Sequence, residues 1–154
     1  MANGKEHRRV GQIAGAGFAA YRARHQDPGL AVLQAVGGVY GGAHGARLHD
    51  VIEPATNPNH RGVGHSVVAN GAVIGLGRAT LDDFQSNLRR WAAEQLDQAR
   101  DSETPLLEAL VRVAGAVGAH LLVGYTNGFV GGAVSHLALD APTAKSIPML
   151  VRGF

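Results

Sequence analysis

The chain contains no cysteine, and this absence excludes several kinds of site. Without thiols there is no disulfide bond, no thiolate-ligated zinc centre and no cysteine nucleophile. A metal ion would have to be held by imidazole nitrogen and carboxylate oxygen. Such a donor set suits zinc, manganese, iron or nickel better than copper(I). The 8 histidines are therefore the residues to follow.

Charged and aromatic residues are also scarce, at 17% and 5% of the chain. The formal net charge is only +2, and the basic residues are spread out except for a short run at residues 5–9. This distribution gives little support for nucleic acid as a partner. No apolar run with a cleavage site follows the first residues, so we expect no signal peptide. We expect the protein to be cytoplasmic or associated with the cytoplasmic membrane.

Glycine is abundant, with 22 residues that lie mostly inside apolar segments. Four stretches lack Asp, Glu, Lys and Arg: residues 10–21, 28–46, 62–77 and 113–139. We interpret each as a helix or a pair of short helices. Residues 1–154 are therefore expected to form a single all-α domain, a compact Gly/Ala-rich bundle. Helices of this composition approach one another closely, and Gly124, Gly128 and Gly132 form one such face.

Residues 79–110 are more polar and predict a water-facing amphipathic helix. We expect Thr80 to cap it, with Asp82 and Asp83 in its first turn. Large apolar side chains then recur at helical spacing (Phe84, Leu88, Trp91 and Leu96). Residues 101–105 are expected to end this helix, and Pro105 to open the next one.

Two segments allow more than one interpretation. The β-branched pairs at 67–68 and 73–74 flank Asn70 and Gly71, which would also fit a hairpin turn; we predict helix there. Residues 113–139 are long enough to span a bilayer, although His120, Asn127 and His136 count against insertion. A soluble bundle and a membrane-embedded protein both remain open.

His136 and Asp140 form the sharpest local signal for chemistry. Four residues apart on a helix, they project from one face, where both can reach a single metal ion. The alternative is a purely structural pair, in which Asp140 accepts a hydrogen bond from His136.

A second group of ligand-type residues lies between residues 50 and 65. His60 and His65 follow two prolines that prevent a continuous helix, so they belong to a loop that either points them inward or leaves them exposed. Asp50 and Glu53, just upstream, could ligate a metal, orient a histidine or act as general base. Arg61 could bind a phosphate or carboxylate, or pair with one of these two acids.

Three segments, taken in order, resemble the motifs of one protein family. Residues 42–54 (GAHGARLHDVIEP) resemble a segment of the form gallPDiDhP. Residues 60–66 (HRGVGHS) resemble HRGxTHS, and residues 131–148 resemble GylsHLllDalTxxGip. An early histidine followed by a glycine, here His7 and Gly11, also recurs. The chain thus resembles the LexA-regulated, inner-membrane-associated metal-dependent hydrolases, distant relatives of the α-helical zinc-dependent phospholipases C.

The resemblance implies a phospholipase C-like helical fold and a set of metal ligands: His7, Asp50, His60, His65, His136 and Asp140. It implies hydrolysis of a small-molecule or lipid phosphoester by metal-activated water. Zinc is the first expectation for the metal, with manganese and iron as alternatives. We expect Asp50 or Glu53 to be the base and Arg61 to be a phosphate clamp.

The sequence also allows an alternative function without catalysis. The chain could be a non-catalytic helical scaffold that retains the hydrolase-like fold. Its Gly-rich faces (residues 37, 38, 41 and 42, and 124, 128 and 132) would then join subunits in a homo-oligomer. Contact with a membrane surface is a further expectation.

Overall fold

The computed structural model describes residues 4–52 and 66–141. Within these ranges the chain forms four helices and no strand: α1 (Gly4–Arg22), α2 (Pro28–Ile52), α3 (Val67–Ala99) and α4 (Leu106–Asp140). The all-α prediction is confirmed. Residues 67–74 are helical, so the hairpin alternative does not form.

The helices begin where local chemistry satisfies their first backbone N–H groups. At α2, the Asp27 carboxylate accepts a hydrogen bond from Gly29 N–H at 2.8 Å, and Pro28 occupies the first position. At α3, the Ser66 hydroxyl accepts from Ala69 N–H at 3.2 Å. The helix start predicted at Thr80 is wrong, because α3 runs through that position without interruption. Asp82 pairs with Arg22 of α1 instead of stabilising a helix start.

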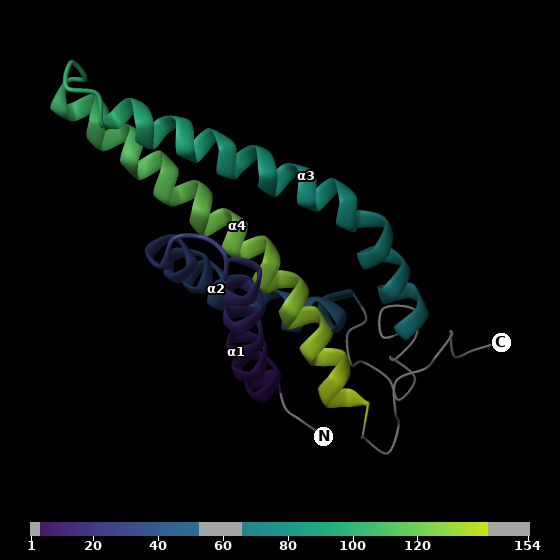
Figure 1. The fold of residues 1–154 in the computed structure, drawn as a ribbon. Coiled ribbons are helices and arrows are strands. Elements are labelled where there is room, and N and C mark those ends of the chain that lie inside the picture. The colour runs from purple at the N-terminus through teal and green to yellow at the C-terminus, as the bar shows by residue number, and fades with distance from the viewer. Residues whose placement is uncertain (1–3, 53–65, 142–154) are drawn as a thin grey trace.

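The helices form a long hairpin with a compact pair at one end (Figure 1). α3 and α4 make the hairpin, and α1 and α2 pack against the C-terminal half of α4 and against each other. Where α3 meets the N-terminal half of α4, Ala92, Ala116 and Ala119 are buried, flanked by Leu88 and Leu96. The end of α3 and the start of α4 extend away from α1 and α2.

Glycines allow α2 to approach α4 at backbone distance. A side chain at Gly41 would overlap the Tyr125 carbonyl oxygen, and one at Gly124 would overlap the Gln34 carbonyl oxygen. Gly128 and Gly132 meet the backbone of Gly38 and Gly42 in the same way. The expected face at 124, 128 and 132 thus packs against α2 within the chain. An interface between subunits would have to use another surface.

The distribution of apolar side chains is unusual for a small domain. Among the described residues, the buried apolar side chains are alanines and Val123. Large apolar side chains lie outside, including Leu76, Leu106 and Ile13, which are 84%, 77% and 75% exposed. α4 is long and apolar enough to cross a membrane, and only 22% of its most apolar window is buried inside the molecule. The chain therefore presents an extensive apolar surface.

Candidate metal centre

Three ligand-type side chains from two helices meet in the interior. His7 of α1 and His136 and Asp140 of α4 are all buried, and their ligand atoms lie within 4.8 Å of one another. His7 Nε2 is 3.5 Å from one carboxylate oxygen of Asp140, and His136 Nε2 is 3.6 Å from the other. Each imidazole thus faces its own oxygen of the same carboxylate.

Close packing of α1 on α4 brings His7 to this point. A Cβ atom at Gly131 would lie 3.1 Å from the Ala14 carbonyl oxygen, and one at Gly15 would lie 3.0 Å from the Gly128 carbonyl oxygen. A side chain at Gly131 would require a shift of a few tenths of an ångström, and one at Gly15 would also overlap α2 at the Gly38 carbonyl oxygen. His7 is two helical turns before Gly15, on the same buried face of α1.

The backbone of α2 fixes the orientation of the His136 ring. Its Nδ1–H donates a hydrogen bond to the Ala46 carbonyl oxygen at 2.6 Å. The lone pair is therefore on Nε2, the atom that faces Asp140. An imidazole that donates one N–H to a backbone carbonyl and presents its other nitrogen is the usual arrangement of a metal ligand.

Asp50 stands at the open side of this group. Its carboxylate lies 3.7 Å from His136 Nε2, and its side chain is 42% exposed, whereas those of His7 and Asp140 are almost fully buried. Asp50 therefore joins the buried cluster to solvent.

A column of three imidazoles sets the charge state of His136. Its ring stacks on His7, with centroids 4.1 Å apart, and on His49, with centroids 4.9 Å apart. Burial is the main cause that lowers the pKa of His136 to about 4, and the charge of His7 adds to it. The Ala46 hydrogen bond and Asp50 act in the opposite direction. At neutral pH His136 is thus neutral, as a metal ligand must be.

His49 has a different role, which the sequence did not reveal. The Asn70 side chain donates to the Ser66 carbonyl oxygen at 2.9 Å, so its amide oxygen is the atom 2.9 Å from His49 Nε2. His49 Nε2–H therefore donates to Asn70 and ties α2 to the start of α3. The only sequence signal for His49 was its position beside Asp50.

One buried polar atom in the cluster is left without a hydrogen bond. His7 Nδ1 has no partner within the ranges 4–52 and 66–141. Buried polar atoms in proteins are nearly always paired, and exceptions are found at functional sites. The contact of His7 with Asp140 is made through the other ring nitrogen, Nε2.

The structure brings together four of the six expected ligands: His7, Asp50, His136 and Asp140. At 3.6 Å, His136 Nε2 and Asp140 Oδ2 are too far apart for a direct hydrogen bond, so this contact does not support the purely structural pair. The remaining expected site residues lie outside the described residues: Glu53, His60, Arg61 and His65.

The other histidines of the described ranges lie apart from this cluster. His25 is exposed, and His44 Nδ1 is 2.9 Å from the Tyr125 hydroxyl on the surface. His120 Nδ1 accepts a hydrogen bond from the Gln34 amide at 3.2 Å. None of these three is placed to share a ligand with His136.

Comparisons of the chain with models of protein families, with curated proteins and with solved structures found no match. The resemblance to the metal-dependent hydrolases stays a prediction carried by its three motifs. The case for a metal centre rests on the geometry of His7, Asp50, His136 and Asp140.

Proposed function

We propose that this protein binds a divalent metal ion through His7, His136 and Asp140 and acts as a metal-dependent hydrolase. One observation carries the proposal. Two imidazoles and a carboxylate, from helices at opposite ends of the chain, converge in the interior around a His136 ring oriented by the Ala46 carbonyl. A group of this kind is costly to bury and needs a compensating function.

The separations suit zinc. Two ligands that each lie about 2.0–2.2 Å from one zinc ion are at most about 4.4 Å apart. The contacts of Asp140 with His7 and His136, at 3.5 and 3.6 Å, are within this limit. Nitrogen and oxygen donors also accept manganese or iron, so the metal is a property to measure.

Three protein ligands leave a coordination position for water or substrate, as catalytic zinc sites do. A divalent ion supplies Lewis acidity there and lowers the pKa of a water molecule. Asp50, half exposed and 3.7 Å from His136 Nε2, is placed to take a proton from an incoming water. We therefore assign Asp50 the role of general base.

Basic side chains on α1 and α2 favour an anionic substrate. A cavity of about 490 Å³ is lined by Gly4, Lys5, Arg8 and Arg47. Arg8 follows the buried His7 in the sequence, and Arg47 follows the buried Ala46, so both arginines present their side chains on the exposed faces of α1 and α2. One arginine guanidinium can donate hydrogen bonds to two phosphate oxygens at once, which supports a small-molecule or lipid phosphoester as substrate.

The exposed apolar surface favours a second candidate function. Large apolar side chains on all four described helices are open to solvent, and extensive exposed apolar surface marks interaction sites. In this alternative the fold is a membrane-associated or homo-oligomeric scaffold that retains the hydrolase-like site. Size-exclusion chromatography with and without detergent distinguishes membrane association from formation of a homo-oligomer.

Metal content tests the primary proposal. Protein purified without a histidine tag would be analysed for bound metal as wild type, as the double variant His136→Ala/Asp140→Ala and as His25→Ala. We expect close to one equivalent of zinc, manganese or iron in wild type and in the exposed-histidine control. The double variant should contain none. Wild-type protein that stays metal-free after reconstitution would overturn the proposal.

A further inference from the structure

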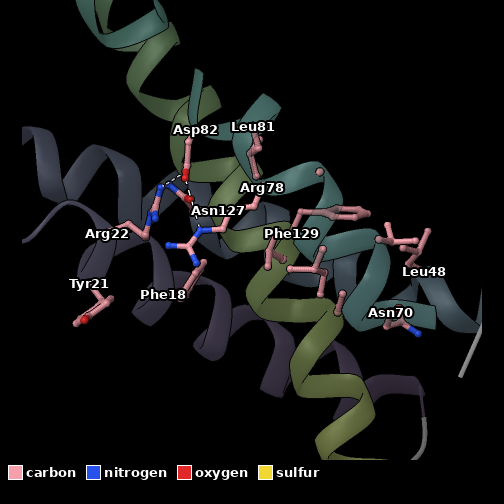
Figure 2. Close-up of a pocket in the computed structure, with 15 residues that line it drawn as sticks. Phe18, Tyr21, Arg22, Leu48, Asn70, Arg78, Leu81, Asp82, Asn127 and Phe129 are labelled. Carbon is pink, nitrogen blue, oxygen red and sulfur yellow. Dashed lines mark hydrogen bonds and ion pairs between the residues drawn. The ribbon is translucent and has the colours of Figure 1, made fainter. Parts of the chain in front are cut away.

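A second cavity, of about 430 Å³, lies between α1, α3 and α4, with Leu48 of α2 at one end (Figure 2). α1 packs on α2 and α4, and α3 packs on α4, so the cavity occupies the space that α1 and α3 leave between them. Its volume is within the range of about 300–1,000 Å³ found for small-ligand pockets. The described residues thus form a partly open, ligand-sized space, lined mainly by α1, α3 and α4.

Most of the cavity wall is apolar. It is lined by large apolar side chains from three helices: Phe18 of α1, Val73, Ile74 and Leu81 of α3, and Phe129 and Val130 of α4. On α3 the lining runs from Asn70 to Asp82, which corresponds to about 18 Å along the helix axis. The space is therefore elongated and suits a flexible chain better than a compact ring.

Charge is concentrated at one end. Figure 2 shows Arg22, Arg78 and Asp82 gathered together, with Leu48 and Asn70 at the opposite end. Arg22 pairs with Asp82, and Arg78 Nε lies 3.6 Å from the second oxygen of Asp82. Asp82 is the only acidic residue among the described residues that line the cavity, and two of the guanidinium groups there share its carboxylate.

A third guanidinium strengthens the positive end. Arg89 lies about two helical turns after Asp82 on α3 and interacts electrostatically with both Arg22 and Asp82. Burial lowers the pKa of Arg89, and the charge of Arg22 lowers it further. Arg22 and Arg78 contact Asp82, and Arg89 lies within electrostatic range of this group. This excess of positive charge is able to attract a further anion.

We propose that this cavity binds a single-chain amphiphile, in which an alkyl chain ends in one anionic group. The anionic head would lie at Arg22 and Arg78, and the alkyl chain would follow α3 toward Asn70. Carboxylate and phosphate heads share this chemistry, because arginine pairs with both. The proposal is independent of the metal centre and holds whether or not the protein is a hydrolase.

Arg22 and Arg78 contribute differently. The Arg22 side chain is 27% exposed and bridges α1 to α3 through Asp82, so its removal would disturb the fold as well as the ligand. The Arg78 side chain is 73% exposed and only loosely paired. It can turn toward a headgroup at little cost, which makes Arg78 the position that tests charge recognition.

Two glycines of α3 provide a matched pair for blocking the cavity. A Cβ atom at Gly77 or at Gly75 would meet nothing within 4 Å, so both positions accept a side chain without a backbone clash. Only Gly77 lines the cavity. Replacing either glycine also favours the helix, because glycine has a low helix propensity. Gly77→Phe should therefore fill the cavity, while Gly75→Phe changes the helix alone.

The test is a fluorescence titration with cis-parinaric acid, below its micelle concentration. We expect saturable binding by wild type and by Gly75→Phe, and at least about tenfold weaker binding by Gly77→Phe. Circular dichroism would confirm that both variants fold. In the Arg78→Ala variant, palmitate should displace the bound cis-parinaric acid about tenfold less effectively, because one charge-assisted hydrogen bond is lost. Displacement of the probe by hexadecanol, which has no charged head, should be unchanged.

Competition with palmitate and with hexadecyl phosphate then identifies the preferred headgroup. No saturable binding by wild type would overturn the proposal. Equal affinities of the Gly77→Phe and Gly75→Phe variants would also overturn it, because the ligand would then occupy another site. Metal content is not part of either result.

Discussion

Asp50 differs from the other members of the metal centre because water reaches it. Its side chain is 42% exposed, whereas that of Asp140 is 5% exposed, yet both carboxylates lie within 4 Å of His136 Nε2. The buried acid suits a permanent ligand, and the exposed acid suits a group that exchanges protons with solvent. The two carboxylates should therefore respond differently to the same substitution.

We expect Asp50→Asn to retain the metal and lose turnover. General-base catalysis contributes about 10²–10⁴-fold to rate, so kcat should fall by that order once a phosphoester substrate is found. Asp140→Asn should instead lose the metal. Elemental analysis and initial rates, with Asp83→Asn as an exposed control, check both statements. An Asp50→Asn variant with full activity would exclude the assigned base.

His120 makes the stability of the protein depend on pH. Its ring is buried, and burial is the main cause that lowers its pKa, with Arg89 adding to the effect. In the unfolded chain its pKa returns to about 6.5, so below that pH the unfolded state binds more protons. The free energy of unfolding should therefore fall as the pH falls below about 6.5.

Urea unfolding of the metal-free protein at pH 7.5 and pH 5.5 measures this effect. We expect His120→Gln to lose less stability between the two pH values than wild type does. The variant His25→Gln, changed at an exposed histidine, should retain the wild-type dependence. An identical pH dependence in His120→Gln would show that other groups cause the acid loss.

At the scale of the helices, contact between α2 and α4 depends on glycine. We expect Gly41→Ala to destabilise the protein by about 2–3 kcal/mol or more, because the new methyl group would overlap the rigid Tyr125 carbonyl. The same substitution at Gly75 meets open space and should stabilise the protein by up to about 1 kcal/mol. Urea unfolding compares the two, and the same sign for both would contradict this packing.

The helices were largely predictable because their signals are local. Charge-poor stretches, Pro28 and the break before Pro105 indicate helix positions without knowledge of the fold. The start predicted at Thr80 failed because Asp82, an ordinary first-turn acid by sequence, pairs with Arg22 of another helix. Sequence spacing alone does not show whether an acidic residue such as Asp82 stabilises the start of a helix or forms an ion pair with another helix.

The arrangement of the candidate metal centre was predictable only in part, for a related reason. His136 and Asp140 share a helix face by spacing alone. Their approach to His7 depends on α1 packing against α4 at Gly15 and Gly131, a contact that only the assembled fold defines. The donation from His49 to Asn70 depends in the same way on how α3 meets α2.

At the scale of the whole molecule, small residues are inside and large apolar residues are outside. Leu106 and Leu107, 77% and 74% exposed, begin α4 at the far end of the hairpin (Figure 1). Such a surface is stable only against another apolar surface. We expect detergent-free preparations to associate, and Leu106→Gln/Leu107→Gln to reduce the association. A monodisperse wild-type monomer in plain buffer, by light scattering, would contradict this expectation.

The metal centre should also hold the two ends of the chain together. His7 belongs to the first helix and His136 and Asp140 to the last, so an ion bound by all three cross-links α1 to α4 and binds only the folded state. At a free zinc concentration 100 times Kd, binding adds about 2.7 kcal/mol to stability. For a chain of this length the increase corresponds to a rise in Tm of about 5–10 °C.

We expect His7→Ala to lose most of this rise and His25→Ala to retain it, measured by thermal unfolding with zinc and with chelator. An equal rise in wild type and His7→Ala would mean that zinc binds without α1, and the coupling between the two helices would then have to come from glycine packing alone.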